Sequence, residues 1–268
     1  MNTMKHLTSL LNLSVDDVHA ILAKSHELKA GWKRGERPAL LQGRYLTQVF
    51  EKPSLRTRVS FDAAMAQLGG TGNFLSGADV GLTTGRESLA DIARVLSGYS
   101  DAVVLRTFSQ KLIEDFASFA RCSVINGLSD DDHPCQALTD IFTLQEMWGD
   151  VRGKRLVFVG DGNNVAASLA MITSMLGMSM TVCAPRDFEL EESLLQAIRL
   201  EYPAADITQT ADLNVAMANA DVAYTDVWAS MGQESEASPT KSSTARTASS
   251  SSKPRTGCTS PKVCWCGC

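Results

Sequence analysis

The segment Ser54-Leu55-Arg56-Thr57-Arg58 brings two hydroxyls and two guanidinium groups together within five residues. It follows an apolar run at residues 45–50, which predicts a buried strand, and precedes a segment of helical character that ends near residue 68. A helix start presents free backbone N–H groups, and arginine forks pair bidentately with phosphate oxygens. The segment therefore predicts a receptor for a dianionic phosphate. Taken alone, it could equally be a solvated basic helix start.

Two further polar residues lie where predicted elements begin or end. Arg106 follows a predicted strand at residues 101–105, and ligands of open α/β sheets bind at the carboxyl ends of strands. His133 precedes Pro134, which suits the first turn of a helix predicted over residues 134–148. Donors placed in advance stabilise a developing oxyanion. We expect both side chains to serve that chemistry; the alternatives are a surface charge and a loop histidine.

The second half of the chain shows strand and helix patterns in alternation. A strand is predicted at residues 155–159, a helix at 164–176 and a strand at 180–184, and this crossover is typical of a parallel sheet. Further strands are predicted at residues 206–209 and 222–225, with helices at 191–201 and 213–219. The turn Gly160-Asp161-Gly162-Asn163-Asn164 lacks the third glycine of a dinucleotide fingerprint, since Val165 stands there. A nicotinamide-dependent oxidoreductase is therefore disfavoured.

Taken together, these motifs resemble those of the aspartate and ornithine carbamoyltransferase family. Ser54 to Arg58 is similar to the family's carbamoyl phosphate signature, and His133-Pro134-Cys135-Gln136 to its His-Pro-x-Gln. The segment Asp226-Val227-Trp228-Ala229-Ser230-Met231-Gly232 resembles the Asp-x-x-x-Ser-Met-Gly of the ornithine branch. The resemblance covers roughly residues 5–236. Acylated ornithine or putrescine stays open as the second substrate.

The resemblance implies a role for each matching residue. Ser54, Leu55 (through its backbone), Arg56 and Thr57 would hold the phosphate, Arg106 and His133 would donate to the carbonyl oxygen, Gln136 would bind the carbamoyl amide, and Asn164, Asp226, Ser230 and Met231 would bind L-ornithine. The δ-amine of ornithine would attack the carbamoyl carbon of carbamoyl phosphate, giving citrulline and phosphate. No metal or organic cofactor is implied. Family members are homotrimers or multiples of trimers.

The implied fold is α/β, with two doubly wound parallel-sheet domains and a cleft between them. Residues 1–148 would form the carbamoyl phosphate-binding domain and residues 149–237 an incomplete ornithine-binding domain. The sequence departs from the family in two places. Residues 77–88 contain no equivalent of the family's Gln, which reaches a neighbouring subunit's site. No histidine follows His133, so the family's His-Cys-Leu-Pro has no counterpart. A catalytically dead, phosphate-binding remnant is therefore an alternative.

Residues 238–268 differ from the rest in composition. Eight of these 31 residues are Ser and five are Thr, and all 30 acidic residues of the chain precede them. Such a segment cannot bury enough apolar surface to order itself, so we expect a disordered tail that is not family sequence. A frameshift near residue 238 would explain it; a basic tether for an acidic partner is another explanation. Its Cys258, Cys264, Cys266 and Cys268 lack the paired spacing of structural zinc sites.

Composition narrows the class of protein further. A net charge of −5 argues against nucleic acid as the main partner. No apolar run approaches 18 residues and polar residues interrupt the N-terminal runs, so we expect neither a membrane span nor a secretory signal. Cys122, Cys135 and Cys183 are scattered and are interpreted as reduced thiols. We therefore expect a cytoplasmic protein.

Overall fold

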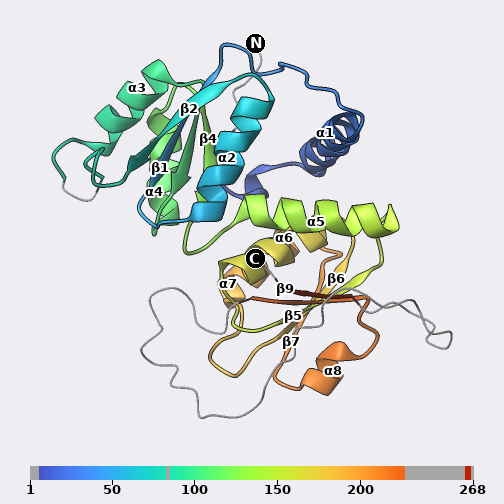
Figure 1. Cartoon of the computed structure of the whole chain (residues 1–268). Helices are drawn as coiled ribbons and strands as arrows, with labels where there is room; N and C mark the ends of the chain where they lie inside the picture. Colours follow the sequence, from blue (N-terminus) through green and yellow to red (C-terminus); the bar gives the residue numbers. More distant parts are fainter. Residues whose placement is uncertain (1–5, 83–84, 227–262, 267–268) are drawn as a thin grey trace, which may run out of the picture.

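The computed structural model describes residues 6–82, 85–226 and 263–266, and within them it is an α/β structure with two parallel sheets (Figure 1). The first sheet has four strands in the order β2-β1-β3-β4, and the second has five in the order β7-β6-β5-β8-β9. The elements of the first half are η1 (Leu10–Asn12), α1 (Val15–Lys33), β1 (Tyr45–Phe50), α2 (Leu55–Gln67), β2 (Thr71–Ser76), α3 (Leu89–Tyr99), β3 (Ala102–Arg106), α4 (Gln110–Phe119), β4 (Ser123–Leu128) and α5 (Pro134–Trp148). Those of the second half are β5 (Arg155–Val159), α6 (Asn164–Met175), β6 (Ser179–Cys183), α7 (Glu192–Glu201), β7 (Asp206–Thr210), α8 (Leu213–Met217), β8 (Val222–Thr225) and β9 (Val263–Cys266).

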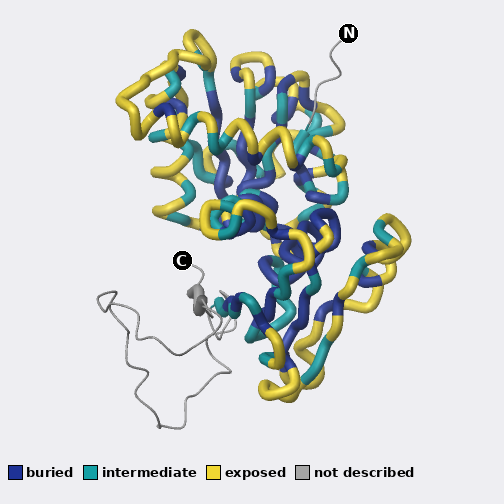
Figure 2. Tube along the Cα trace, turned by 90° about the vertical axis from the view of Figure 1, so that its right-hand side faces the viewer, coloured by how far each residue is buried: buried dark blue, intermediate teal, exposed yellow. Residues whose placement is uncertain are grey.

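Helices cover both faces of the first sheet. Phe50 of β1 packs with Met65 of α2 on one face, while Val49 packs with Ile92 of α3 and Phe116 of α4 on the other. Strands β1, β3 and β4 therefore run through the buried interior of this half, whereas the edge strand β2 is partly exposed (Figure 2). Burial on both faces explains why β3 is apolar from Ala102 to Leu105 without alternation.

Helix α5 lies between the two sheets (Figure 1). Its buried side chains, among them Ile141, belong to the same apolar cluster as Leu10 of η1, Val18 of α1, Ile172 of α6 and Leu156 of β5. One core thus extends from the N-terminal helices into the second sheet. The boundary at residue 148 and the cleft between the domains both stay predictions.

Several helix starts follow directly from the sequence. Ser14 and Asp17 form a reciprocal capping box at the start of α1. Pro134 occupies the first turn of α5. Helix α6 begins after Asn163, whose side chain accepts from the N–H groups of Val165 and Ala166.

The C-terminal segment differs in part from the prediction. Residues 263–266 form β9, parallel to β8, with Cys266 opposite Thr225. A paired strand at these four residues was not expected from the sequence. The remaining residues of the 238–268 segment lie outside the described residues. No helix in the described part of the chain is long and apolar enough to cross a membrane.

Candidate functional site

The predicted phosphate receptor lies where three neighbouring strands end. Phe50, the last residue of β1, pairs with Arg106 of β3, which pairs with Leu128 of β4. The loops after these strands therefore begin side by side. They carry the Ser54 motif, Arg106 itself and the segment that leads to His133, so the structure brings the three parts of the predicted site to one sheet edge.

The Ser54 motif forms the first turn of α2. Ser54 is the N-cap, and its Oγ accepts from the Thr57 N–H at 3.3 Å while its hydroxyl donates to Thr57 Oγ1 at 2.9 Å. Arg58 turns elsewhere: it lies 4.0 Å from the Phe74 ring centroid and 3.9 Å from a carboxylate oxygen of Asp62. The guanidinium group of Arg58 therefore lies against other side chains. Of the motif's two arginines, Arg56 is the one without an ion pair to a described carboxylate, so its charge can attract an anion.

Arg106 is 4% exposed and reaches back to this turn. Its Nε donates to the Lys52 carbonyl at 3.2 Å, and its Nη1 donates to Thr57 Oγ1 at 3.5 Å. Burial lowers the pKa of Arg106, and the neighbouring charge of Arg56 lowers it further. Among the described residues no carboxylate forms an ion pair with either arginine. Two neighbouring cations without a counter-ion among the described residues favour the binding of an anionic ligand.

His133 is the N-cap residue of α5 and is held from the second half of the chain. Its backbone N–H donates to Ser168 Oγ of α6 at 2.7 Å, and the Ser168 hydroxyl donates to the buried carboxylate of Asp132. Burial, and then the charge of Arg106, lowers the pKa of His133 to about 4. Its Nδ1 is buried and has no hydrogen-bond partner among the described residues. With a pKa of about 4 the ring is neutral at pH 7, so one of its nitrogens donates and the other accepts.

Gln136 lies on the first turn of α5 and points along the helix to Asp140. Its Nε2 donates to Asp140 Oδ1 at 3.0 Å. Burial raises the pKa of Asp140 to about 7, and the negative charge of Asp226 contributes to the rise. Asp226, which directly follows β8, is a predicted ornithine ligand. Asp140 therefore interacts with one predicted ligand from each substrate subsite, Gln136 and Asp226.

The predicted ornithine subsite is only partly assembled by the described residues. Asn163 Nδ2, rather than Asn164, donates to Asp226 Oδ2, at 3.3 Å. The Asn164 amide instead donates to the Ser129 carbonyl in the first half of the chain. Ser230 and Met231 lie outside the described residues. Sequence reasoning missed Asn163, although its place in the Asp-Gly-Asn-Asn turn was a signal.

Sequence reasoning also missed a clamp formed by Lys52 and Asp130. Lys52 is 8% exposed, pairs with the Asp130 carboxylate and lies 4.5 Å from the Phe108 ring centroid. The Asp130 N–H donates to the Phe108 carbonyl at 2.9 Å, and the Phe108 N–H donates to Glu51 Oε2 at 3.1 Å. These contacts join the loops after β1, β3 and β4. They therefore determine how the Ser54 turn, Arg106 and His133 are spaced.

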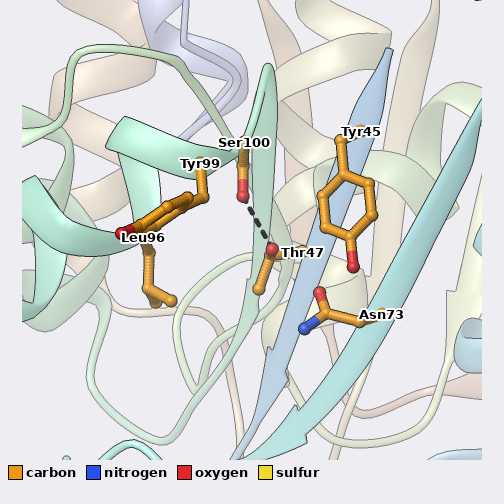
Figure 3. Close-up of a pocket in the computed structure, with 6 residues that line it drawn as sticks. All are labelled: Tyr45, Thr47, Asn73, Leu96, Tyr99 and Ser100. Carbon is orange, nitrogen blue, oxygen red and sulfur yellow. Dashed lines mark hydrogen bonds between the residues drawn. The ribbon is translucent and has the colours of Figure 1, made fainter. Parts of the chain in front are cut away.

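The described residues contain no cluster of three or more potential metal ligands. A Cβ at Gly162 would lie 2.6 Å from the Glu189 backbone, so this glycine is explained by close packing of two loops. A separate cavity of about 390 Å³ is lined by residues of β1, β2 and α3 and by Ser100, among them Tyr45, Asn73 and Tyr99 (Figure 3). None of the predicted site residues lines it.

Comparison with known proteins identifies the family. Residues 5–146 match the family model of the aspartate/ornithine carbamoyltransferase carbamoyl-P binding domain, and residues 152–248 match that of the Asp/Orn binding domain. The ornithine carbamoyltransferase of Anoxybacillus flavithermus is 45% identical over 235 residues, which are 87% of this chain and 74% of that protein. The anabolic ornithine carbamoyltransferase of Pyrococcus furiosus is 44% identical over 237 residues, with the same two coverages.

Solved structures agree with the sequence comparison. A Pyrococcus furiosus ornithine carbamoyltransferase structure superposes with a TM-score of 0.82 at 43% identity, covering 87% of this chain and 74% of that one. That from Thermus thermophilus gives a TM-score of 0.75 at 34% identity, covering 83% and 74%. With both halves of the chain matched in sequence and in fold, the protein belongs to the ornithine carbamoyltransferase family.

Proposed function

We propose that this chain transfers the carbamoyl group of carbamoyl phosphate to the δ-amine of L-ornithine, within arginine metabolism. The observation that carries the proposal is the pair of guanidinium groups of Arg56 and Arg106. They lie beside the capped turn of α2, and no described carboxylate pairs with them. A dianionic phosphate supplies the missing charge, and the donors of the α2 turn supply its hydrogen bonds.

The reaction follows from the groups around that phosphate. Ser54, the Leu55 backbone, Arg56 and Thr57 hold the phosphate, while Arg106 and His133 donate to the carbonyl oxygen. The lone pair of the attacking amine forms the new C–N bond, and negative charge develops on that oxygen. The bond between the carbamoyl carbon and the phosphate oxygen then breaks, phosphate leaves with the electron pair, and the amine loses a proton. Donors already in place lower the barrier because they need no reorganisation.

His133 suits this role because its ring is neutral. A pKa of about 4 leaves one N–H donor and one acceptor at pH 7. A neutral imidazole donates to the carbonyl oxygen without adding a third full positive charge beside Arg56 and Arg106. We assign the donor role to the ring nitrogen that faces the substrate.

The amino-acid end of ornithine is assigned to the second half. Asp226 binds the α-ammonium group, and Asn163 orients that carboxylate through its 3.3 Å hydrogen bond. Asn164, Ser230 and Met231 complete the subsite in the proposal. A carboxylate at this position favours a free α-amine over an acylated one, and putrescine lacks the α-carboxylate altogether. Ornithine is therefore the preferred second substrate.

We also propose that the active form is a homotrimer or a multiple of trimers, as in the family. Residues 77–88 would approach a neighbouring subunit's site, but they supply no Gln there. Sedimentation equilibrium on the whole chain tests this assembly: a monomer at micromolar concentration would contradict it.

A citrulline assay tests the function directly. The whole chain is incubated with carbamoyl phosphate and, in parallel, with ornithine, N-acetylornithine, putrescine or aspartate. The ureido product is measured for each amine and is expected with ornithine alone, as citrulline; Arg106→Met serves as the control of low activity. Binding of the stable analogue phosphonoacetamide without any turnover would instead support the phosphate-binding remnant, the second candidate, which the missing His-Cys-Leu-Pro favours.

A further inference from the structure

Asp140 is a buried carboxyl group next to a predicted substrate ligand. It lies one helical turn after Gln136 on α5, so both side chains occupy the same face of the helix. Asp140 is 2% exposed, and its Oδ1 accepts from Gln136 Nε2 at 3.0 Å. A buried carboxyl group is costly unless it is hydrogen-bonded, and this hydrogen bond offsets part of that cost.

The hydrogen bond determines which end of the Gln136 amide faces away from Asp140. A glutamine amide has an oxygen that only accepts and a nitrogen that only donates, and the two ends are similar in shape. Above its pKa of about 7 Asp140 is a carboxylate, which can only accept, so at pH 8 it selects the nitrogen. Tyr224 of β8 also hydrogen-bonds to Asp140, so the carboxyl group is held from two elements. Gln136 Oε1 is thereby left as the acceptor for a ligand.

That acceptor is what a carbamoyl group requires. The carbonyl oxygen of the carbamoyl group accepts hydrogen bonds, whereas its NH₂ group only donates. A Gln136 amide rotated by 180° would present its own N–H groups to that NH₂, and neither group would then be paired. Leaving such buried polar groups unpaired costs about tenfold or more in binding. An acetyl group has the same shape but no N–H, so it gains nothing from Oε1.

We propose that Asp140 is a positioning residue that orients the Gln136 amide, so that the site distinguishes a carbamoyl group from an acyl group of the same shape. This inference rests on the proposed function, because it takes Gln136 as the ligand of the carbamoyl amide. Asp140 itself touches no substrate. Its effect passes through one hydrogen bond to Gln136.

The test compares two stable ligands that differ only at that amide. Phosphonoacetamide carries the carbamoyl NH₂, and acetonylphosphonate carries a methyl group in its place. Calorimetry on the whole chain gives the ratio of their dissociation constants, and no turnover is needed. The unmodified chain is expected to prefer phosphonoacetamide, and Asp140→Leu is expected to reduce that preference about tenfold while acetonylphosphonate binds as before. Asp140→Asn keeps an acceptor oxygen and is expected to restore the preference.

Other outcomes overturn the inference. If Asp140→Leu weakens both ligands equally, Asp140 has a structural role only. If it still reduces the preference in a Gln136→Met background, it does not act through Gln136. If the unmodified chain binds neither phosphonate, the proposed function itself fails, which is a separate result. Should Asp140→Leu not fold, the Gln136 side-chain amide protons of the unmodified chain decide: slow exchange with solvent supports the hydrogen bond, and fast exchange refutes it.

Discussion

Replacing Lys52 with methionine tests whether the clamp between the three loops positions the phosphate site. The substitution keeps most of the apolar stem and removes the ammonium group. That group pairs with Asp130, whose side chain is 58% exposed, and lies 4.5 Å from the Phe108 ring centroid. An ion pair with one exposed partner contributes about 0.2–1 kcal/mol. A cation against an aromatic ring contributes about 0.5–1 kcal/mol.

The expected loss in the free energy of unfolding is therefore about 1–2 kcal/mol, measured by urea denaturation. The affinity for phosphonoacetamide should fall by about fivefold, which equals about 1 kcal/mol, because Arg106 and the Ser54 turn lose their fixed spacing. Lys24→Met is the matched control, since Lys24 forms an exposed pair with Glu27 at 2.9 Å. It should change stability by less than about 0.5 kcal/mol and leave the affinity unchanged.

Asp130→Asn sharpens the same test, because it leaves the Lys52 ammonium group without its carboxylate. Its cost should equal or exceed that of Lys52→Met, and the double variant should cost less than the sum of the two. Strict additivity, or a Lys52→Met chain as stable as Lys24→Met, would refute the clamp. A loss of stability with unchanged affinity would mean that the clamp supports the fold alone.

Three further predictions concern the site. Arg106→Met should lower kcat by about 10²–10³-fold in the citrulline assay, because a donor to the developing oxyanion is lost; a change in KM alone would contradict that role. Ser54→Ala should reduce the free energy of unfolding by about 1 kcal/mol through loss of the helix cap, and should weaken phosphonoacetamide binding measured by calorimetry. Asp140→Asn should flatten the pH dependence of stability in urea denaturation. The folded pKa of about 7 lies above the ordinary 3.8, so the unfolded chain releases this proton first and stability falls, by up to about 4 kcal/mol, as pH rises through that window. The Asn variant should lack this fall, whereas an unchanged slope between pH 4 and 7 would contradict it.

Strands β3 and β5, at the centre of the two sheets, could be predicted because burial on both faces makes them largely continuous apolar runs. Strand β1 could be predicted from its apolar ends, although Thr47 and Gln48 at its centre are buried polar residues. Strand β2 was not predicted: it lies at the sheet edge and reads Thr71-Gly72-Asn73 at its start. Only its pairing with β1 specifies it, and Gly72 allows close contact because a Cβ there would lie 2.4 Å from the Leu46 carbonyl oxygen. Strand β9 was missed for the same reason.

Some features of the candidate site could be predicted from the sequence and others could not. Residues at the ends of parallel strands could be predicted to converge, because parallel strands end at one sheet edge. Which of Asn163 and Asn164 faces Asp226 could not, since the two are adjacent and only the capping geometry of α6 separates them.

Other groups hold the substrate ligands in place without being predicted to contact the substrate, and these could not be predicted from the sequence. Lys52 and Asp130 are 78 positions apart, and Asp132 and Ser168 are 36 apart. Neither pair belongs to a motif, and each contact exists only after the loops and α6 have packed. The sequence therefore predicts which groups meet the substrate more readily than which groups hold them in place. Lys52 and Asp140, which position the substrate ligands, are buried ionisable groups that belong to no motif. Their substitution should change affinity and selectivity while the fold is kept.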